Sequence, residues 1–174
     1  MKKLLIVVDM QNDFIDGALG TKEAEAIVDN VVSKISNFNG DIYATLDTHF
    51  EDYMNTSEGE KLPIPHCIKG TNGWNINEKV QSALDEKGYI KVEKITFGSV
   101  GLPQIISDTY NVAEIEIELV GLCTDICVVS NALMLKAHFP EINIYVDSAC
   151  CAGVTPEKHK AALETMSSCQ INII

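Results

Sequence analysis

Three residues far apart in the chain, Asp9, Lys94 and Cys127, are of the types that together can hydrolyse an acyl bond. A cysteine attacks as the thiolate, which a nearby positive charge and the N-terminus of a helix both favour. Lys94 can supply that charge, and Asp9 can hold the lysine or take the thiol proton and later deliver it to a leaving amine. The backbone N–H groups of Cys123 and Cys127 can stabilise the oxyanion. A cysteine alone is more often a small buried residue, so the catalytic hypothesis depends on the three residues converging.

A second group of side chains, in the middle of the chain, suits a divalent metal ion. Asp47 and His49 form an Asp-x-His pair, and His66 follows in the sequence Pro-Ile-Pro-His-Cys. Carboxylate and imidazole ligands suit zinc, manganese or iron and leave coordination positions open for water or substrate. Glu58 is a candidate fourth ligand. Because an Asp-x-His pair alone is weak evidence, the metal site is a hypothesis that needs His66 to lie nearby.

The hydrophobic pattern predicts the elements that must position these residues. Short β-rich runs alternate with amphipathic helical patterns, which implies parallel β-α-β units with right-handed crossovers. We therefore predict an α/β fold of three layers, with a doubly wound, mainly parallel sheet of six strands and helices on both faces. The predicted strands are 4–8, 42–46, 89–92, 115–121, 142–146 and 171–174. The predicted helices are 22–37, 124–138 and one that opens with Thr155 and Pro156, with weaker signals at 75–87 and 100–107.

The candidate residues all fall where predicted strands end. Asp9 ends the first strand, Asp47 the second and Lys94 the third, and Cys127 lies in the first turn of the helix after the fourth. In a doubly wound sheet the carboxyl ends of the strands meet at one crevice, beside the point where the strand order reverses. The stretch 48–72 has no clear periodicity, and loops of that length are usually functional. The sequence thus predicts one active-site crevice.

Composition restricts the class of protein further. The chain has 174 residues, 46% of them hydrophobic and 22% charged, which is typical of one globular domain, here residues 1–174. The net charge of −12 argues against nucleic acid as a partner, because binding phosphates needs a positive patch. No stretch approaches the roughly 18 apolar residues of a membrane span. The apolar run after the N-terminus is too short for a signal peptide, so we expect a cytoplasmic protein with a small-molecule substrate.

The remaining cysteines and histidines are expected to have no chemical role. The chain has six cysteines and no Cys-x-x-Cys pair, and a reducing compartment keeps thiols free. We expect Cys67 to be structural although it adjoins His66, because adjacent side chains usually diverge. His138 and His159 lie on predicted helices, away from the strand ends, and are interpreted as surface or packing residues.

Five short segments, in this order, resemble the isochorismatase-like cysteine hydrolases, and within them the nicotinamidase (pyrazinamidase) branch. They are VVDMQNDF at 7–14, DTH at 47–49, PHC at 65–67, VEK at 92–94 and GLCTDICV at 121–128. Each segment is short, but five of them in the family's order, spread over nearly the whole chain, form a specific signal. The length of the chain also suits a member that consists of one domain.

The resemblance implies an amidohydrolase that converts nicotinamide and water to nicotinate and ammonia, in NAD salvage. Cys127 would be the nucleophile, with Asp9 and Lys94 completing a triad, and would form a thioester that water then hydrolyses. The bond broken is a non-peptide C–N bond of a small linear or aromatic amide. The resemblance also implies a cis peptide between Leu122 and Cys123, with an oxyanion hole from the amides of Cys123 and Cys127.

The resemblance further implies one divalent metal ion, zinc first, with manganese or iron as alternatives. Its ligands would be Asp47, His49 and His66, and Glu58 lies at a spacing that some nicotinamidases use for an additional ligand. The metal would hold the pyridine nitrogen of the substrate, or a water in its place. Relatives commonly self-associate, so a homo-oligomer is also implied.

The substrate pocket matches the family's pattern less well than the triad does. Phe14 matches the aromatic wall for the substrate ring, and Phe97, just after the lysine, is a candidate second wall. Many nicotinamidases carry a tryptophan shortly before the His-Cys of the long loop, where this chain has Leu62 at the start of Leu-Pro-Ile-Pro. We place Leu62 in the pocket. The single tryptophan, Trp74, comes later, and a missing aromatic lid weakens ring stacking by about 0.5–1.5 kcal/mol.

The sequence is also compatible with three other functions. A relative in the same superfamily could act on another small amide, a ureido compound or a vinyl ether, although isochorismatases proper do not need the Asp-x-His and His set. A binding or regulatory module on the flavodoxin-like plan would require Asp9, Lys94 and Cys127 to converge by chance. A thiol redox protein could use Cys123 and Cys127, and would lose its activity when Cys123 is replaced by serine.

Overall fold

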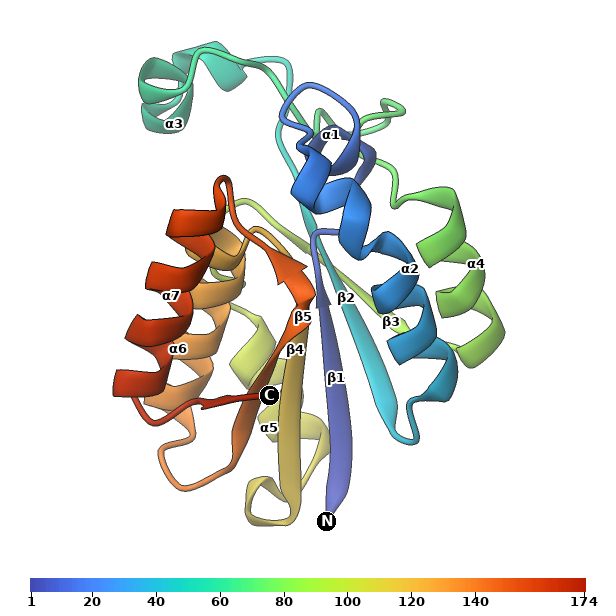
Figure 1. Ribbon diagram of the computed structural model, residues 1–174, viewed down its shortest axis with the longest axis vertical. Coiled ribbons are helices and arrows are strands. Elements are labelled where there is room, and N and C mark those ends of the chain that lie inside the picture. Colours follow the sequence, from blue (N-terminus) through green and yellow to red (C-terminus); the bar gives the residue numbers. More distant parts are fainter.

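Six strands, all parallel, form the central sheet of the computed structural model, which describes residues 1–174 (Figure 1). Their order across the sheet is β3-β2-β1-β4-β5-β6. The chain runs outward from β1 to β2 and β3, returns to β4 on the other side of β1, and runs outward again, so the order reverses between β1 and β4. The strands are β1 (Lys2–Val8), β2 (Asp41–Asp47), β3 (Ile90–Lys94), β4 (Ile115–Leu122), β5 (Ile144–Ala152) and β6 (Asn172–Ile173).

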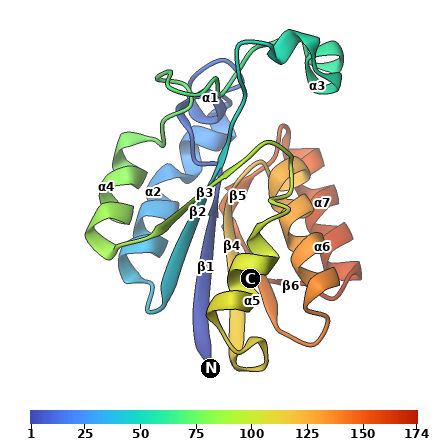
Figure 2. The same cartoon turned by 180° about the vertical axis from the view of Figure 1, so that it is seen from behind.

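Helices cover both faces of the sheet and give the fold its three layers (Figure 2). Helices α2 (Lys22–Asn37) and α4 (Glu78–Lys87) pack on one face, and α5 (Leu102–Thr109), α6 (Val129–His138) and α7 (Pro156–Ser168) pack on the other. A separate apolar core lies on each side of the sheet. The predicted doubly wound α/β fold is confirmed. None of the helices combines the length and the apolar character that a bilayer span requires.

The best-predicted element, α2, shows how local sequence sets the architecture. The Thr21 side chain accepts a hydrogen bond from the Ala24 N–H at 3.0 Å and caps the helix. From there an apolar stripe faces the sheet, and the helix ends at Asn37, as predicted. The buried residues of this stripe are Ala24, Ile27, Val28, Val31 and Ile35.

Some helices and strands begin or end at other residues than predicted, and two short helices were not predicted. The predicted helix 124–138 begins as a π-helical turn, Thr124–Val128, before α6. Strand β5 continues to Ala152 because Cys151 and Ala152 are buried and pair with the end of β4, whereas β6 has only two residues. The sequence pattern missed the one-turn helix α1 (Asn12–Ile15) and the helix α3 (Ser57–Lys61) inside the long loop.

Gly121 allows β4 to approach the end of β1 closely. Its φ is +118°, and a Cβ atom there would collide with the carbonyl oxygen of Val8. Only glycine meets both conditions without strain. The last residues of β4 and the turn that carries Cys127 can therefore lie against Asp9.

Candidate active site

The structure brings Asp9, Lys94 and Cys127 together at the carboxyl edge of the sheet. Lys94 Nζ lies 2.6 Å from Asp9 Oδ2 and donates to Cys127 Sγ at 3.5 Å. The three residues are 0%, 5% and 4% exposed, respectively. They come from the end of β1, the end of β3 and the turn after β4. A carboxyl group, an ammonium and a thiol thus meet in a site that excludes bulk water.

Asp9 is held in an unusual backbone conformation. Its φ is +47°, in the left-handed region that non-glycine residues rarely adopt. Thr45 on β2 fixes it from both sides, since its Oγ1 donates to Asp9 Oδ1 at 2.7 Å and its carbonyl oxygen accepts from the Asp9 N–H at 3.1 Å. Asp9 Oδ2 has no hydrogen-bond partner beyond its ion pair with Lys94. This oxygen is therefore available to accept a proton.

The protonation states in this site follow from burial. Burial raises the pKa of Cys127 well above its usual value, and the negative charge of Asp9 adds to the shift, while Lys94 opposes it. Burial also raises the pKa of Asp9. For Lys94, burial lowers the pKa, but the charges of Asp9 and Cys127 outweigh burial and raise it. The resting site thus holds an ammonium and a thiol, which differs from the thiolate that the sequence suggested, because burial and the charge of Asp9 together outweigh the charge of Lys94.

The turn before the nucleophile presents backbone donors. The peptide between Leu122 and Cys123 is cis. The Cys123 carbonyl accepts from the N–H groups of Ile126 at 3.1 Å and Val128 at 3.0 Å, which closes the π-helical turn around Cys127. The Cys123 N–H itself has no backbone acceptor. A free donor beside the nucleophile is the arrangement that an oxyanion requires.

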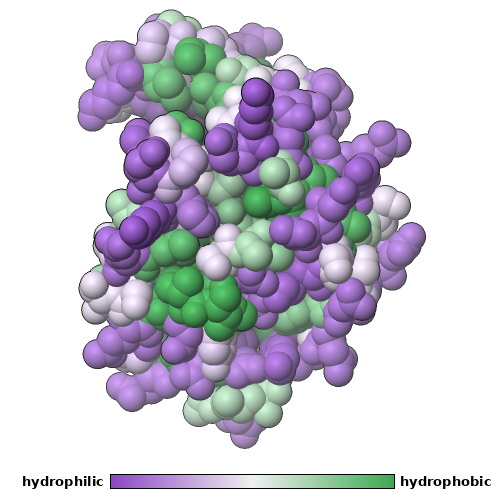
Figure 3. Space-filling view, viewed as in Figure 1, coloured by the Kyte–Doolittle hydropathy of each residue, from purple (hydrophilic) through white to green (hydrophobic).

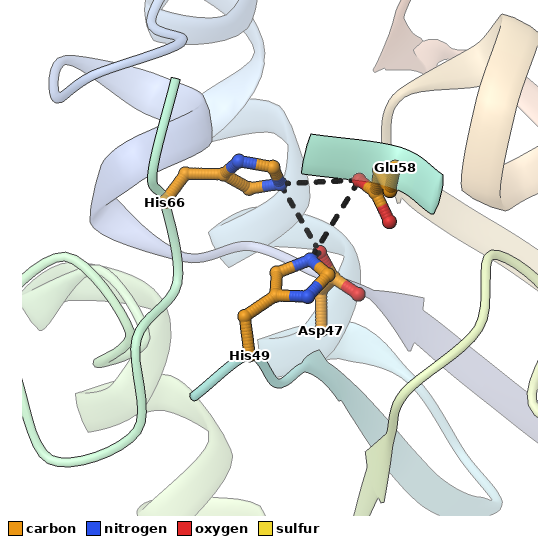
Figure 4. A group of neighbouring side chains, drawn as sticks. All are labelled: Asp47, His49, Glu58 and His66. Carbon is orange, nitrogen blue, oxygen red and sulfur yellow. Dashed lines mark hydrogen bonds and ion pairs between the residues drawn. The ribbon is translucent and has the colours of Figure 1, made fainter. Parts of the chain in front are cut away.

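The four candidate metal ligands point at one another (Figure 4). The ligand atoms of Asp47, His49, Glu58 and His66 all lie within 4.8 Å of one another. Asp47 Oδ2 lies 3.0 Å from His49 Nε2 and 3.5 Å from His66 Nε2, and Glu58 Oε1 lies 3.5 Å from His66 Nε2. His66 Nδ1 lies 2.9 Å from the carbonyl oxygen of Ile64. A proton donated through this contact leaves Nε2 free to bind a metal.

This donor set fits a divalent cation. It combines two imidazoles with two carboxylates, which suits zinc and other first-row ions. Asp47, His49 and His66 are buried, and the atoms that would bind a metal, Asp47 Oδ2 and the two Nε2 atoms, face one another and Glu58. Although burial raises the pKa of Asp47, hydrogen bonds from His49 and His66 and the charge of Lys94 outweigh it and lower the pKa. Asp47 is therefore an anion, and one cation would neutralise this group.

Asp47 also joins the metal group to the triad. Its Oδ1 lies 3.5 Å from Lys94 Nζ, while its Oδ2 faces the two imidazoles. Asp47 and Lys94 are paired in the register of β2 and β3. Strand β1 lies on the other side of β2, and Asp9 follows its last residue. The two groups are therefore parts of one site.

A cavity of about 410 Å³ opens onto both groups, a size typical of small-molecule sites. The three predicted pocket residues, Phe14, Leu62 and Phe97, line it. Phe14 packs with its ring centroid 5.5 Å from the ring of His66. Five residues described above also line this cavity: Asp47, Glu58, His66, Cys123 and Cys127.

The sequence missed six further lining residues, Leu19, Ser57, Lys61, Ile95, Thr96 and Ile126. Two of them, Ile95 and Ile126, directly adjoin Lys94 and Cys127, so their position in the chain was a usable signal. Ser57 and Lys61 belong to α3, which stands out from the body of the protein with a notch beneath it (Figure 3). Because the sequence did not predict α3, no sequence pattern indicated that Ser57 and Lys61 line the cavity.

Trp74 and His159 are two aromatic residues that do not line the cavity, and His159 lies in a different place from the one that the sequence suggested. Trp74 is outside the cavity: its Nε1 donates to Thr48 Oγ1 at 2.9 Å, and Lys91 Nζ lies 5.0 Å from its ring. The sequence suggested that His159 lies away from the strand ends, but the structure places it beside them. Its Nδ1 lies 2.7 Å from Thr124 Oγ1, in the turn of the nucleophile, because the first turn of α7 packs against that turn.

The comparisons with known proteins place this chain among hydrolases that act on amide C–N bonds. Residues 3–174 match the isochorismatase domain, and the chain belongs to the isochorismatase family. It is 30% identical over 173 residues to the isochorismatase family protein PncA of Bacillus subtilis, covering 94% of this chain and 93% of that protein. It is 26% identical over 186 residues to the nicotinamidase/pyrazinamidase of Mycobacterium tuberculosis, covering 99% and 98%.

Solved structures agree with this family and with the fold. The crystal structure of nicotinamidase PncA from Bacillus subtilis matches with a TM-score of 0.85 at 28% identity, over 99% of both chains. The pyrazinamidase of Pyrococcus horikoshii in complex with zinc matches with a TM-score of 0.78 at 26% identity, over 100% of this chain and 99% of that one. The family resemblance seen in the sequence is confirmed.

Proposed function

We propose that this chain is a cysteine-dependent nicotinamidase, which converts nicotinamide and water to nicotinate and ammonia. The observation that carries the proposal is that Cys127 lines the same cavity as Asp47, Glu58 and His66, with Phe14 as an aromatic wall. The names of the relatives from Mycobacterium tuberculosis and Bacillus subtilis support the choice of substrate. In this proposal the chain acts as one domain over residues 1–174, in the cytoplasm, in the salvage of NAD.

The first half of the reaction forms a thioester and releases ammonia. Cys127 Sγ attacks the carboxamide carbon while its proton passes to Asp9. The carbonyl oxygen becomes an oxyanion, which accepts hydrogen bonds from the N–H groups of Cys123 and Cys127. The C–N bond then breaks as Asp9 returns the proton to the leaving nitrogen. Lys94 stays charged throughout and stabilises the carboxylate of Asp9 between the two transfers.

The second half regenerates the enzyme. A water molecule attacks the thioester carbon and gives a proton to Asp9, and the same backbone donors hold the second oxyanion. The C–S bond breaks, the carboxylic acid leaves, and the proton on Asp9 returns to Cys127. The raised pKa of Asp9 suits this exchange, because a more basic carboxylate takes a proton from a thiol more readily.

We further propose that Asp47, His49, His66 and Glu58 hold one divalent ion, with zinc as the first choice. When bound, a Lewis acid of this kind supplies an attachment point for the ring nitrogen of the substrate, or for a water in its place. The mixed imidazole and carboxylate ligands support zinc, and so does the zinc complex of the Pyrococcus horikoshii pyrazinamidase.

Ammonia release from nicotinamide tests the proposal directly. Enzyme reconstituted with zinc is expected to release ammonia, and chelator-treated enzyme is expected to lose most of that rate, because the ligand set faces the cavity. Addition of zinc to the chelated sample is the control and should restore the rate. A folded, zinc-loaded sample that releases no ammonia would rule out nicotinamide. Hydrolysis of another small amide by that sample would then identify the alternative substrate class.

Replacement of Cys123 by serine separates hydrolysis from thiol redox chemistry. In the hydrolase, Cys123 acts through its backbone N–H, so the variant should hydrolyse nicotinamide at close to the wild-type rate, measured as ammonia release. In a redox protein the second thiol is essential. A variant that folds but loses its activity would therefore favour the redox alternative.

A further inference from the structure

The segment 7–14 contains three polar residues to which the reaction gives no role, and two of them, Gln11 and Asp13, bind the backbone next to candidate metal ligands. Asp9 belongs to the triad and Phe14 lines the cavity. Gln11 is fully buried, and a buried polar side chain is costly unless its hydrogen bonds are satisfied. We propose that Gln11 and Asp13 are positioning residues that hold the two ends of the metal-ligand segment 47–66 in place. This proposal rests on the function proposed above, because it assumes that Asp47 and His66 bind the metal ion.

Gln11 binds the backbone of Asp47 as a neighbouring strand would. Its Oε1 accepts from the Asp47 N–H at 2.8 Å, and its Nε2 donates to the Asp47 carbonyl at 2.8 Å. The pairing of β1 with β2 ends at Val8 and Thr45, so β1 itself offers no partner to the last residue of β2. The side chain of Gln11 supplies the two missing bonds. A third bond, from Nε2 to the carbonyl of Trp74 at 2.8 Å, fixes the orientation of the amide.

The position of Asp47 matters to both halves of the site. One carboxylate oxygen faces Lys94 at 3.5 Å, and the other faces His49 at 3.0 Å. The side-chain amide of Gln11 fixes the backbone of Asp47 without adding a charge to this crowded group. Partners that orient a ligand in this way typically change metal affinity by 10–100-fold when they are removed.

Asp13 holds the other end of the ligand segment. Its Oδ2 accepts from the N–H of Cys67 at 2.7 Å, directly after His66. Cys67 has a φ of +47°, so its backbone needs support from its surroundings. The carbonyl of the same residue accepts from the His49 N–H at 2.9 Å, which ties the two ends of the segment together. Asp13 thereby orients the His66–Cys67 peptide, and Cys67 in turn binds the backbone of His49.

Close packing around Asp13 makes this support rigid. A Cβ atom on Gly73 would collide with its carboxylate, and the Asp13 N–H donates to the Gly73 carbonyl at 3.0 Å. Asp13 Oδ1 also lies 3.3 Å from the N–H of Ala18. The carboxylate is therefore held from three sides. The segment 7–14 thus contains the proposed base, Asp9, and the two residues, Gln11 and Asp13, that bind the ends of the metal-ligand segment.

Zinc affinity, measured by competition with a chromophoric chelator, tests the proposal on folded protein without using substrate. We expect Gln11→Met and Asp13→Leu each to weaken zinc binding by about 10–100-fold. Asp13→Asn keeps one acceptor oxygen for the Cys67 N–H and should restore most of the affinity. The matched control is Gln104→Met, which removes an exposed amide that donates to Asp108 at 2.7 Å on α5 and should leave zinc affinity unchanged.

Cooperative thermal unfolding selects the variants that are folded, so that a general loss of structure is not read as a loss of positioning. If Gln11→Met does not fold, the comparison of Asp13→Leu with Asp13→Asn carries the test. Folded variants that bind zinc as tightly as wild type would overturn the inference. Weakened zinc binding in the variants, together with no ammonia release from nicotinamide by wild type, would support the positioning role and reject the proposed substrate.

Discussion

Replacing Cys127 with alanine is expected to lower the rate of ammonia release by at least about 1000-fold, a loss typical of removing a catalytic nucleophile. Cys127 Sγ is the group placed against both Lys94 and the cavity. Without it no thioester can form, and Asp9 has no thiol proton to move. The measurement is ammonia release at saturating substrate, where the loss should appear in kcat.

Two controls make the result specific to chemistry. Cys169 is exposed, and Cys169→Ala should keep the wild-type rate. Cys127→Ala removes one buried atom, so cooperative unfolding should persist, and its zinc affinity should match wild type because Cys127 is not a member of the ligand set. Turnover retained in this variant would reject the assignment of the nucleophile.

The second large effect is expected from His66→Ala. His66 Nε2 faces both carboxylates of the metal group, at 3.5 Å from Asp47 Oδ2 and from Glu58 Oε1. Removing it deletes one of two imidazoles and leaves two carboxylates and a single histidine. Removing a partner of a ligand already costs 10–100-fold in affinity, so loss of the ligand itself should weaken zinc binding by more than about 100-fold.

Metal content after dialysis and the KM for nicotinamide are the two measurements for this variant. Content should fall and KM should rise, since His66 lines the cavity. The control is His138→Ala, because His138 is exposed, its ring nitrogen lies 3.0 Å from the carbonyl oxygen of Met134 on its own helix, and it is not a member of the metal group. Unaltered metal content in His66→Ala would show that the ligand set is wrong.

The parts of the site that lie on strand ends could be predicted from the sequence. Runs of apolar residues mark the strands, and parallel strands all end at one edge, so the types of Asp9, Asp47 and Lys94 at those ends were enough to predict a shared crevice. The apolar stripe of α2 was equally clear, since its period and its bounds, 22–37, both agree with the structure.

Other features depend on tertiary environment, which no local pattern carries. The protonation state of Cys127 depends on its burial among residues distant in the sequence, and that burial reversed the expectation of a thiolate. The role of Gln11 depends on backbone groups 36 residues away in the chain, and a backbone partner leaves no mark on the sequence. Helix α3 has only five residues, too few to show a period, and His159 reaches the site only because α7 packs there.

The segment between β2 and His66 carries both a wall of the cavity and three of the four candidate metal ligands, namely His49, Glu58 and His66. Ser57, Lys61 and Leu62 line the cavity from it, while Glu58 and His66 point at Asp47. The triad, in contrast, is anchored on the sheet. Exchange of this one segment during evolution would alter substrate choice and metal dependence in a single event, leaving the proton-transfer chemistry in place. The two traits are therefore expected to be inherited together, as one module.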